Sequence, residues 1–169
     1  MEFLSLANQR RSIRAYKPLK VEQEKINLIL ESGRIAPTAA NLQPVKVLAV
    51  QSEENLAKLG KSANIYGAPL ALIVLADHSS AWTRPFDKKQ TTDIDASIVT
   101  DHMMLQAESL GLGSVWVCFF KPYVLKKEFD IPENFEPINI LAIGYSAENN
   151  DVTEKQRKSI ESFVAFEHL

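Results

Sequence analysis

The chain has 169 residues, of which 46% are hydrophobic, and its formal net charge is −2. This length suits one domain with its own core, so residues 1–169 are expected to form a single domain. Nucleic acids and anionic membranes are not expected as partners, because both call for a strongly basic domain. The only cysteine, Cys118, excludes an internal disulfide, and no secretory signal or bilayer-length apolar run is visible. These features predict a cytoplasmic protein.

The N-terminal region combines a short amphipathic segment with a group of arginines. Residues 3–9 carry apolar side chains at helical spacing, which predicts a helix ending near Arg10. Arg10, Arg11, Ser12 and Arg14 then fall within five residues. If Ile13 and Ala15 point inward along an extended strand, the polar side chains share its other face. Because arginine matches phosphate oxygens in pairs, this segment is a candidate anion-binding edge; a solvated basic turn is the alternative.

The next elements alternate between helix, loop and strand. Residues 21–34 show an apolar stripe that predicts a helix. Residues 36–44 hold two prolines, small residues and two amides, and predict a loop. Such a loop can bring backbone N–H groups close to a ligand, or it can be an ordinary connection. Residues 45–51 alternate as a strand does, and residues 53–61 predict a short helix with Ser52 as its N-cap.

The middle of the chain holds the most apolar segments. Residues 69–76 form an unbroken apolar run, which predicts a central strand buried on both faces. Residues 78–90 are polar and irregular, as in a loop or mobile lid. A long helix follows, from a cap at Asp93 or Asp95 to Leu110, with a wide apolar face. Such a helix belongs in a core or at a subunit interface.

The remaining elements complete an α+β pattern. His102 lies on the long helix, and without metal-ligand neighbours it is expected to be structural. Residues 114–118 and 137–145 predict strands, and residues 123–129 predict a helix. Strands alternating with helices indicate one α+β domain with helices on both faces of its sheet. The tail, residues 146–169, ends with apolar side chains that require a partner surface. These are Ile160, Phe163, Val164 and Phe166.

Several common catalytic motifs are missing from the sequence. There is no P-loop, no Gly-x-Ser-x-Gly and no cluster at metal-ligand spacing. The run at residues 111–113 is not a dinucleotide fingerprint, because its third glycine is missing and it follows a helix. An enzyme with so few side-chain nucleophiles would rely on a cofactor.

Four motifs, in the same order along the chain, resemble those of the nitroreductase-like FMN-dependent oxidoreductases in their short form. They are the arginine segment at 10–16, the Asn-x-Gln-Pro loop at 36–44, the turn at 110–116, and residues 144–145 followed by 155–157. The resemblance implies a nitroreductase-like α+β fold, in which helices flank both faces of a central, mostly antiparallel sheet. It also implies a homodimer with a domain-swapped C-terminal tail and FMN at the subunit interface.

The resemblance further implies which residues contact FMN. Arg10 would lie mainly at the phosphate and Arg14 nearer the pyrimidine edge of the ring. Cys118 is expected to be a buried structural thiol first, a flavin neighbour second and a redox group third. The implied contacts are Arg10, Arg11, Ser12 and Arg14; Thr38, Asn41 and Gln43 in a loop supplied by the other subunit; Trp116, Val117 and Cys118 beside the ring; and Lys155 and Arg157 at the phosphate.

The implied activity is transfer of hydride from NADH or NADPH, through FMN, to an electron-poor acceptor such as a nitroaromatic or a quinone. Flavin N5 would carry the chemistry in a ping-pong cycle, so no side-chain acid or base is expected to be catalytic. Three alternatives stay open. They are a flavin carrier or sensor without turnover, a relative with other flavin chemistry such as reductive dehalogenation or flavin fragmentation, and a dimeric structural domain without flavin.

Overall fold

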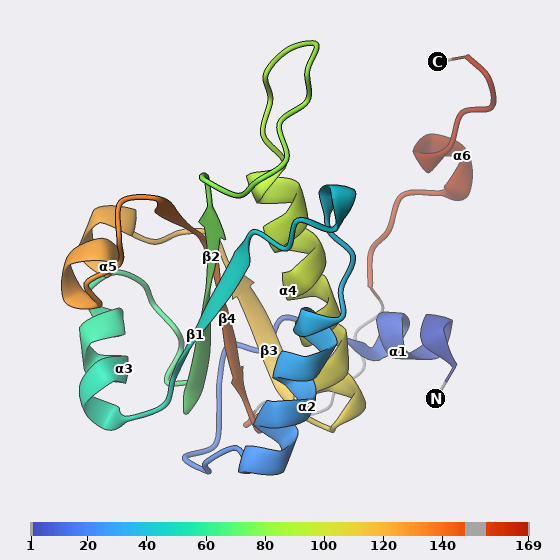
Figure 1. Ribbon diagram of the computed structural model, residues 1–169. Coiled ribbons are helices and arrows are strands. Elements are labelled where there is room, and N and C mark those ends of the chain that lie inside the picture. Colours follow the sequence, from blue (N-terminus) through green and yellow to red (C-terminus); the bar gives the residue numbers. More distant parts are fainter. Residues whose placement is uncertain (1, 148–154, 169) are drawn as a thin grey trace.

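The computed structural model describes residues 2–147 and 155–168 (Figure 1). Within these residues, four antiparallel strands form one sheet in the order β1-β2-β4-β3. The expected α+β architecture with an antiparallel sheet is therefore confirmed. The strands are β1 (Val45–Val50), β2 (Leu70–Asp77), β3 (Gly113–Val117) and β4 (Phe135–Gly144).

Helices cover both faces of the sheet, as the alternating pattern predicts (Figure 1). Two of them, α2 and α4, share one hydrophobic cluster with the sheet, while α3 and α5 share the other. The helix α1 contacts α4, and α6 lies in the C-terminal tail. The bounds are α1 (Phe3–Gln9), α2 (Gln23–Arg34), α3 (Glu53–Gly60), α4 (Thr92–Ser109), α5 (Pro122–Glu128) and α6 (Ile160–Phe163), with a short 3-10 turn η1 (Ala39–Asn41).

Strand β2 joins the two layers of the core. Because successive side chains on a strand point to opposite faces, neighbours enter different layers. Leu72 packs with α2 and α4, whereas Ile73 packs with α3 and α5, and both side chains are fully buried. The unbroken apolar sequence of this strand thus reflects a sheet covered on both faces.

The start of α4 differs from the sequence prediction, because neither Asp93 nor Asp95 caps the helix. Thr91 occupies the N-cap position, and no side chain makes a capping hydrogen bond there. Asp95 lies inside the first turn and is only 1% exposed. Its carboxylate joins the start of the helix to a distant loop: Oδ1 accepts a hydrogen bond from Ala39 N at 2.8 Å, and Oδ2 accepts one from Thr91 Oγ1 at 2.8 Å. A tertiary contact has replaced the expected cap.

The arginine segment is less regular than the predicted strand. Ser12 forms an isolated parallel bridge with Ser114 at the start of β3. Ile13 is half-buried against Gly113, as predicted, and its N–H donates to Ser114 O at 2.9 Å. Ala15, however, is exposed, so the predicted inward position of this residue is wrong. The segment bridges the edge of the sheet at single points, which leaves its side chains without strict alternation.

Residues 78–90 form the predicted loop, which joins β2 to α4 and projects beyond the end of the sheet (Figure 1). An isolated bridge between Thr83 and Gln90 closes it into a narrow arm. In the part of the chain that the structure describes, every helix is too short or too polar to cross a bilayer.

Candidate functional site

The first group of candidate residues is a cationic cluster formed by Arg10, Arg11, Lys155 and Arg157. Two of these residues follow α1 and two lie in the tail, so the cluster joins opposite ends of the sequence. Lys155 Nζ donates to Ala7 O at 3.0 Å, which fastens the tail to α1. Burial lowers the pKa of Lys155, and the positive charges of the three arginines lower it further. The three arginines therefore lie close enough to Lys155 for their charges to act on it, and such a group of cations favours an anion.

Glu108, near the C-terminal end of α4, is a carboxylate that belongs to the same neighbourhood. It opposes the lowering of the Lys155 pKa. Burial raises the pKa of Glu108 itself, and the charges of Arg10 and Lys155 offset this only in part. Glu108 thus lies within electrostatic reach of Arg10 and Lys155, and burial disfavours its charged form.

Ser114 adds a buried hydroxyl close to the arginine segment. The residue is 1% exposed and bridges to Ser12, yet its Oγ has no hydrogen-bond partner among the described residues. Arg14 Nη1 in turn donates to Ser12 O at 3.4 Å. A buried hydroxyl without a partner is uncommon, and it marks a position that a ligand or water can satisfy. The sequence placed Ser114 in a strand but gave no signal that its hydroxyl would lack a partner.

The second group of candidates lies in residues 38–43, called here the left-handed loop. Ala40, Asn41 and Gln43 have φ angles of 51°, 54° and 52°. For residues other than glycine this region costs on the order of 1 kcal/mol each. Thr38 offsets part of this cost, since its Oγ1 accepts from Gln43 N at 3.0 Å and its carbonyl oxygen accepts from Asn41 N at 3.0 Å. The loop is therefore strained but closely hydrogen-bonded.

The left-handed loop and the cationic cluster lie near opposite ends of α4 in one chain. Asp95 contacts the loop, and Glu108 neighbours the cluster. These residues are 13 positions apart on α4. At the helical rise per residue this is about 20 Å. A single chain consequently does not bring the two groups of candidate residues together.

The third group lies at the end of β3. Trp116 and Val117 are in the strand, and Trp116 Nε1 is buried without a hydrogen-bond partner in the described structure. Cys118 follows the last strand residue and is exposed, so the prediction of a buried structural thiol is wrong. The sheet ends at Val117, and the chain turns outward there, leaving Phe119 96% exposed.

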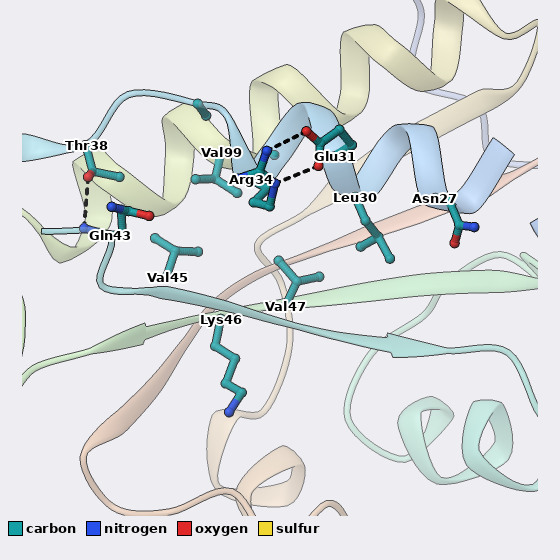
Figure 2. A pocket seen from close by; sticks show the side chains of 12 residues that line it. Asn27, Leu30, Glu31, Arg34, Thr38, Gln43, Val45, Lys46, Val47 and Val99 are labelled. Atoms are coloured by element: carbon teal, nitrogen blue, oxygen red, sulfur yellow. Dashed lines mark hydrogen bonds and ion pairs between the residues drawn. The ribbon is translucent and has the colours of Figure 1, made fainter. Parts of the chain in front are cut away.

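A pocket of about 440 Å³ lies between α2, β1 and the left-handed loop (Figure 2). Leu30, Val45 and Val47 contribute apolar side chains, while Lys46 points to the other side of β1. A paired Glu31 and Arg34 lie at its rim, with both hydrogen bonds 2.6 Å long. Of the predicted site residues, Thr38 and Gln43 line this pocket. Its apolar floor is suited to side chains or rings rather than to phosphate.

In the described residues, no group of three or more His, Cys, Asp or Glu side chains that could hold a metal ion gathers. His102 Nδ1 lies 2.9 Å from Ile98 O on its own helix. This contact agrees with the structural role that the sequence predicted for the histidine.

Comparison with known proteins agrees with this architecture. The chain matches the Nitroreductase family over residues 7–64 and 56–145. A Bacillus subtilis protein named FMN reductase (NAD(P)H) is 30% identical, in a match covering 88% of this chain and 68% of that protein. A nitroreductase family protein from Clostridium difficile 630 is 52% identical and covers 100% of both chains, with a TM-score of 0.95.

A second solved structure, titled FMN-dependent nitroreductase and also from Clostridium difficile (R20291), is 28% identical. It aligns over 99% of this chain and 100% of that one, with a TM-score of 0.82. The family match spans most of the chain, and the likeness in structure extends over all of it. On this evidence the chain belongs to the nitroreductase family.

Proposed function

We propose that the protein is an FMN-dependent oxidoreductase that takes hydride from NADH or NADPH and delivers it to a small electron-poor acceptor, such as a nitroaromatic or a quinone. Membership of the nitroreductase family supports oxidoreductase chemistry. The names of similar proteins, FMN reductase and FMN-dependent nitroreductase, support the cofactor. The observation that carries the assignment is the cationic cluster, in which the charges of Arg10, Arg11 and Arg157 add to the lowering of the Lys155 pKa by burial.

The side chains of the cluster fit the phosphate of FMN. Arginine presents two parallel donors to a pair of phosphate oxygens, and lysine acts as a point charge. The pKa of Lys155 is lowered by burial and by the arginine charges, and a bound dianion would oppose both effects. The unpartnered Ser114 Oγ, beside Ser12, supplies a further donor at the edge of this site. In this proposal Arg10, Arg11, Lys155 and Arg157 hold the phosphate.

The remaining candidates would surround the flavin ring. Arg14 would lie at the pyrimidine edge, where a positive charge favours the reduced anionic flavin. Trp116, Val117 and Cys118 would line one side of the ring. Thr38, Asn41 and Gln43 would come from a second subunit, because in one chain the loop and the cluster neighbour residues of α4 that are about 20 Å apart along the helix. The site would thus be complete only in a homodimer.

The exposed apolar side chains support this assembly. Ile160, Phe163 and Phe166 in the tail are 65%, 81% and 88% exposed, and Phe3 and Leu4 in α1 are 64% and 74% exposed. Large apolar side chains left exposed in one chain are typical of an interface. We propose that the tail crosses onto the partner subunit as a domain-swapped segment.

FMN, when bound, supplies hydride transfer at N5, so the protein needs no side-chain acid or base. Its own residues would bind the phosphate, hold the polar edge of the ring and leave one ring face open. Donor and acceptor would then occupy the same place in turn, which predicts ping-pong kinetics.

The test is steady-state oxidation of NADH and NADPH by the FMN-loaded protein, with menadione and a nitroaromatic as acceptors. The proposal predicts turnover with parallel lines in double-reciprocal plots. FMN binding without turnover of either donor would instead support a flavin carrier or sensor. The absence of flavin binding would refute the proposed cofactor.

A further inference from the structure

We propose that Asp95 is a positioning residue of the FMN site, because its buried carboxylate holds the left-handed loop in the shape that presents Asn41 and Gln43 to the flavin. This inference rests on the proposed function, which identifies FMN as the ligand of the loop. It adds a residue on α4 that the motifs of the sequence do not include, and it assigns that residue a task distinct from phosphate binding.

The contacts of Asp95 connect a rigid element to a strained one. Oδ1 accepts from Ala39 N, at the start of η1, and Oδ2 accepts from Thr91 Oγ1, both at 2.8 Å. Thr91 therefore fixes the orientation of the carboxylate, and the carboxylate fixes Ala39. The α4 backbone, which supports Asp95, is packed against the sheet and against α2. The loop is thus anchored to the core through this side chain.

The loop depends on hydrogen bonds for its shape. Ala40, Asn41 and Gln43 adopt positive φ angles, although the segment between Gly33 and Gly60 contains no glycine. Glycine would adopt such angles without steric strain, whereas these residues require contacts that hold them there. The other bonds described for the loop run between its own members, such as Gln43 N to Thr38 Oγ1. The contact with Asp95 is the one that ties η1 to α4.

The geometry explains why a carboxylate occupies this buried position. Asp95 is 1% exposed, and a buried carboxylate is costly unless its oxygens accept hydrogen bonds. Both oxygens do so here. Asn41 and Gln43, in contrast, are exposed. The arrangement places the buried end of the network against α4 and leaves the amide side chains of the loop available to a ligand.

The test compares dissociation constants for FMN and riboflavin, measured by flavin fluorescence, in variants of the full-length protein. Asp95→Ala is expected to raise both dissociation constants about tenfold. This is the change expected if the loop of the variant adopts its binding shape about a tenth of the time. Asp95→Asn should stay within roughly threefold of wild type, because an amide can still accept from Ala39 N and donate to Thr91 Oγ1. Asp93→Ala, an exposed carboxylate in the same turn, is the matched control.

Riboflavin separates this role from phosphate binding. Arg10→Ala should weaken FMN and leave riboflavin unchanged, whereas Asp95→Ala should weaken both. Wild-type affinity for riboflavin in Asp95→Ala, measured well below its melting temperature, would overturn the inference, even if the variant were less stable. Weakening of FMN alone by Asp95→Ala would overturn it as well, because it would place the effect at the phosphate.

Amide hydrogen exchange gives a readout that needs no ligand. In the wild-type protein the Ala39 amide should exchange slowly, and Asp95→Ala should accelerate exchange at Ala39, Asn41 and Gln43 together. Exchange of the wild-type Ala39 amide at the rate of an unstructured peptide would refute the contact, including the case in which Asp95→Ala does not fold. If the wild type binds neither flavin, the proposed function fails, while this measurement still decides whether Asp95 orders the loop.

Discussion

The left-handed loop and the cationic cluster achieve binding geometry in different ways. The loop is held in a strained shape by hydrogen bonds to Thr38 and Asp95 before any ligand arrives. The cluster instead gathers like charges: burial lowers the pKa of Lys155 most, and repulsion by the neighbouring arginines lowers it further. A preorganised loop should respond little to salt or to the charge of the ligand, whereas a cationic cluster should respond to both. Shape and charge are thus supplied by separate parts of the chain.

The largest effect is expected from removing the tail. Deletion of residues 153–169 takes away two cations of the cluster, Lys155 and Arg157, and the exposed apolar side chains of α6. The ends of this deletion, Thr153 and Leu169, lie outside the described residues. We expect light scattering to show a monomer, because the tail would no longer join the subunits. FMN binding should also be lost, since the cationic cluster of one subunit and the left-handed loop of the other would be separated. Arg157→Ala should remain dimeric; a dimeric truncated protein would contradict the proposed assembly.

Arg10→Ala tests the charge side of the comparison alone. Removal of a charge-assisted contact to phosphate should weaken FMN binding by about 2 kcal/mol, or roughly thirtyfold. Arg10→Lys keeps the charge but loses the planar fork of donors, so its affinity for FMN should lie between those of Arg10→Ala and the wild-type protein. Isothermal titration with FMN and riboflavin measures these differences. Equal affinity of Arg10→Ala and wild type for FMN would remove Arg10 from the phosphate site.

Alkaline pH should affect the binding of FMN and of riboflavin differently. The pKa of Lys155 is lowered from 10.5 by burial and by neighbouring arginines. Charged Lys155 attracts phosphate, so FMN affinity should fall as the pH rises through this depressed pKa, in a window below 10.5. Riboflavin affinity should stay level there, and Lys155→Met should remove this part of the FMN profile. Identical pH profiles for the two ligands would show that Lys155 does not contribute its charge to binding.

The smallest effect concerns the loop at residues 78–90. His78 Nδ1 lies 2.6 Å from Gln90 Oε1, and Nε2 lies 2.6 Å from Glu136 Oε2. These contacts raise the pKa of His78 above 6.5. Their contribution to stability is fully present below pH 6.5 and is lost as the pH rises through the folded-state pKa.

We therefore expect His78→Gln to lower the melting temperature at pH 6 more than at pH 9. The side chains of His78 and Glu136 are 42% and 50% exposed, so the difference should be a fraction of 1 kcal/mol. Thermal melts followed by circular dichroism provide the measurement. A larger decrease in melting temperature at pH 9 than at pH 6 would contradict a stabilising role for protonated His78.

Local patterns in the sequence sufficed for most elements of the fold. The apolar run of β2 and the Ser52 cap of α3 depend on neighbouring residues, and both were predicted; Ser52 Oγ accepts from Asn55 N at 3.3 Å. The role of Asp95 could not be predicted in this way, because its partner Ala39 is 56 positions away.

Other features depend on where an element stops in three dimensions. Cys118 is exposed because β3 ends one residue earlier, and the sequence around it reads as a continuous strand. Positive φ angles at Ala40 and Gln43 carry no sequence signal, since neither residue is glycine. The motifs thus supply the candidate site residues, which stay a prediction, while long-range contacts determine how the left-handed loop is held.

The visible absorption spectrum of the purified protein, recorded anaerobically before and after addition of FMN and then of NADH or NADPH, tests the central claim most directly. Our account predicts flavin bands that remain with the protein on gel filtration and bleach when the nicotinamide donor is added. Protein that stays colourless after incubation with FMN would contradict it, and the arginine segment would then be only a basic turn.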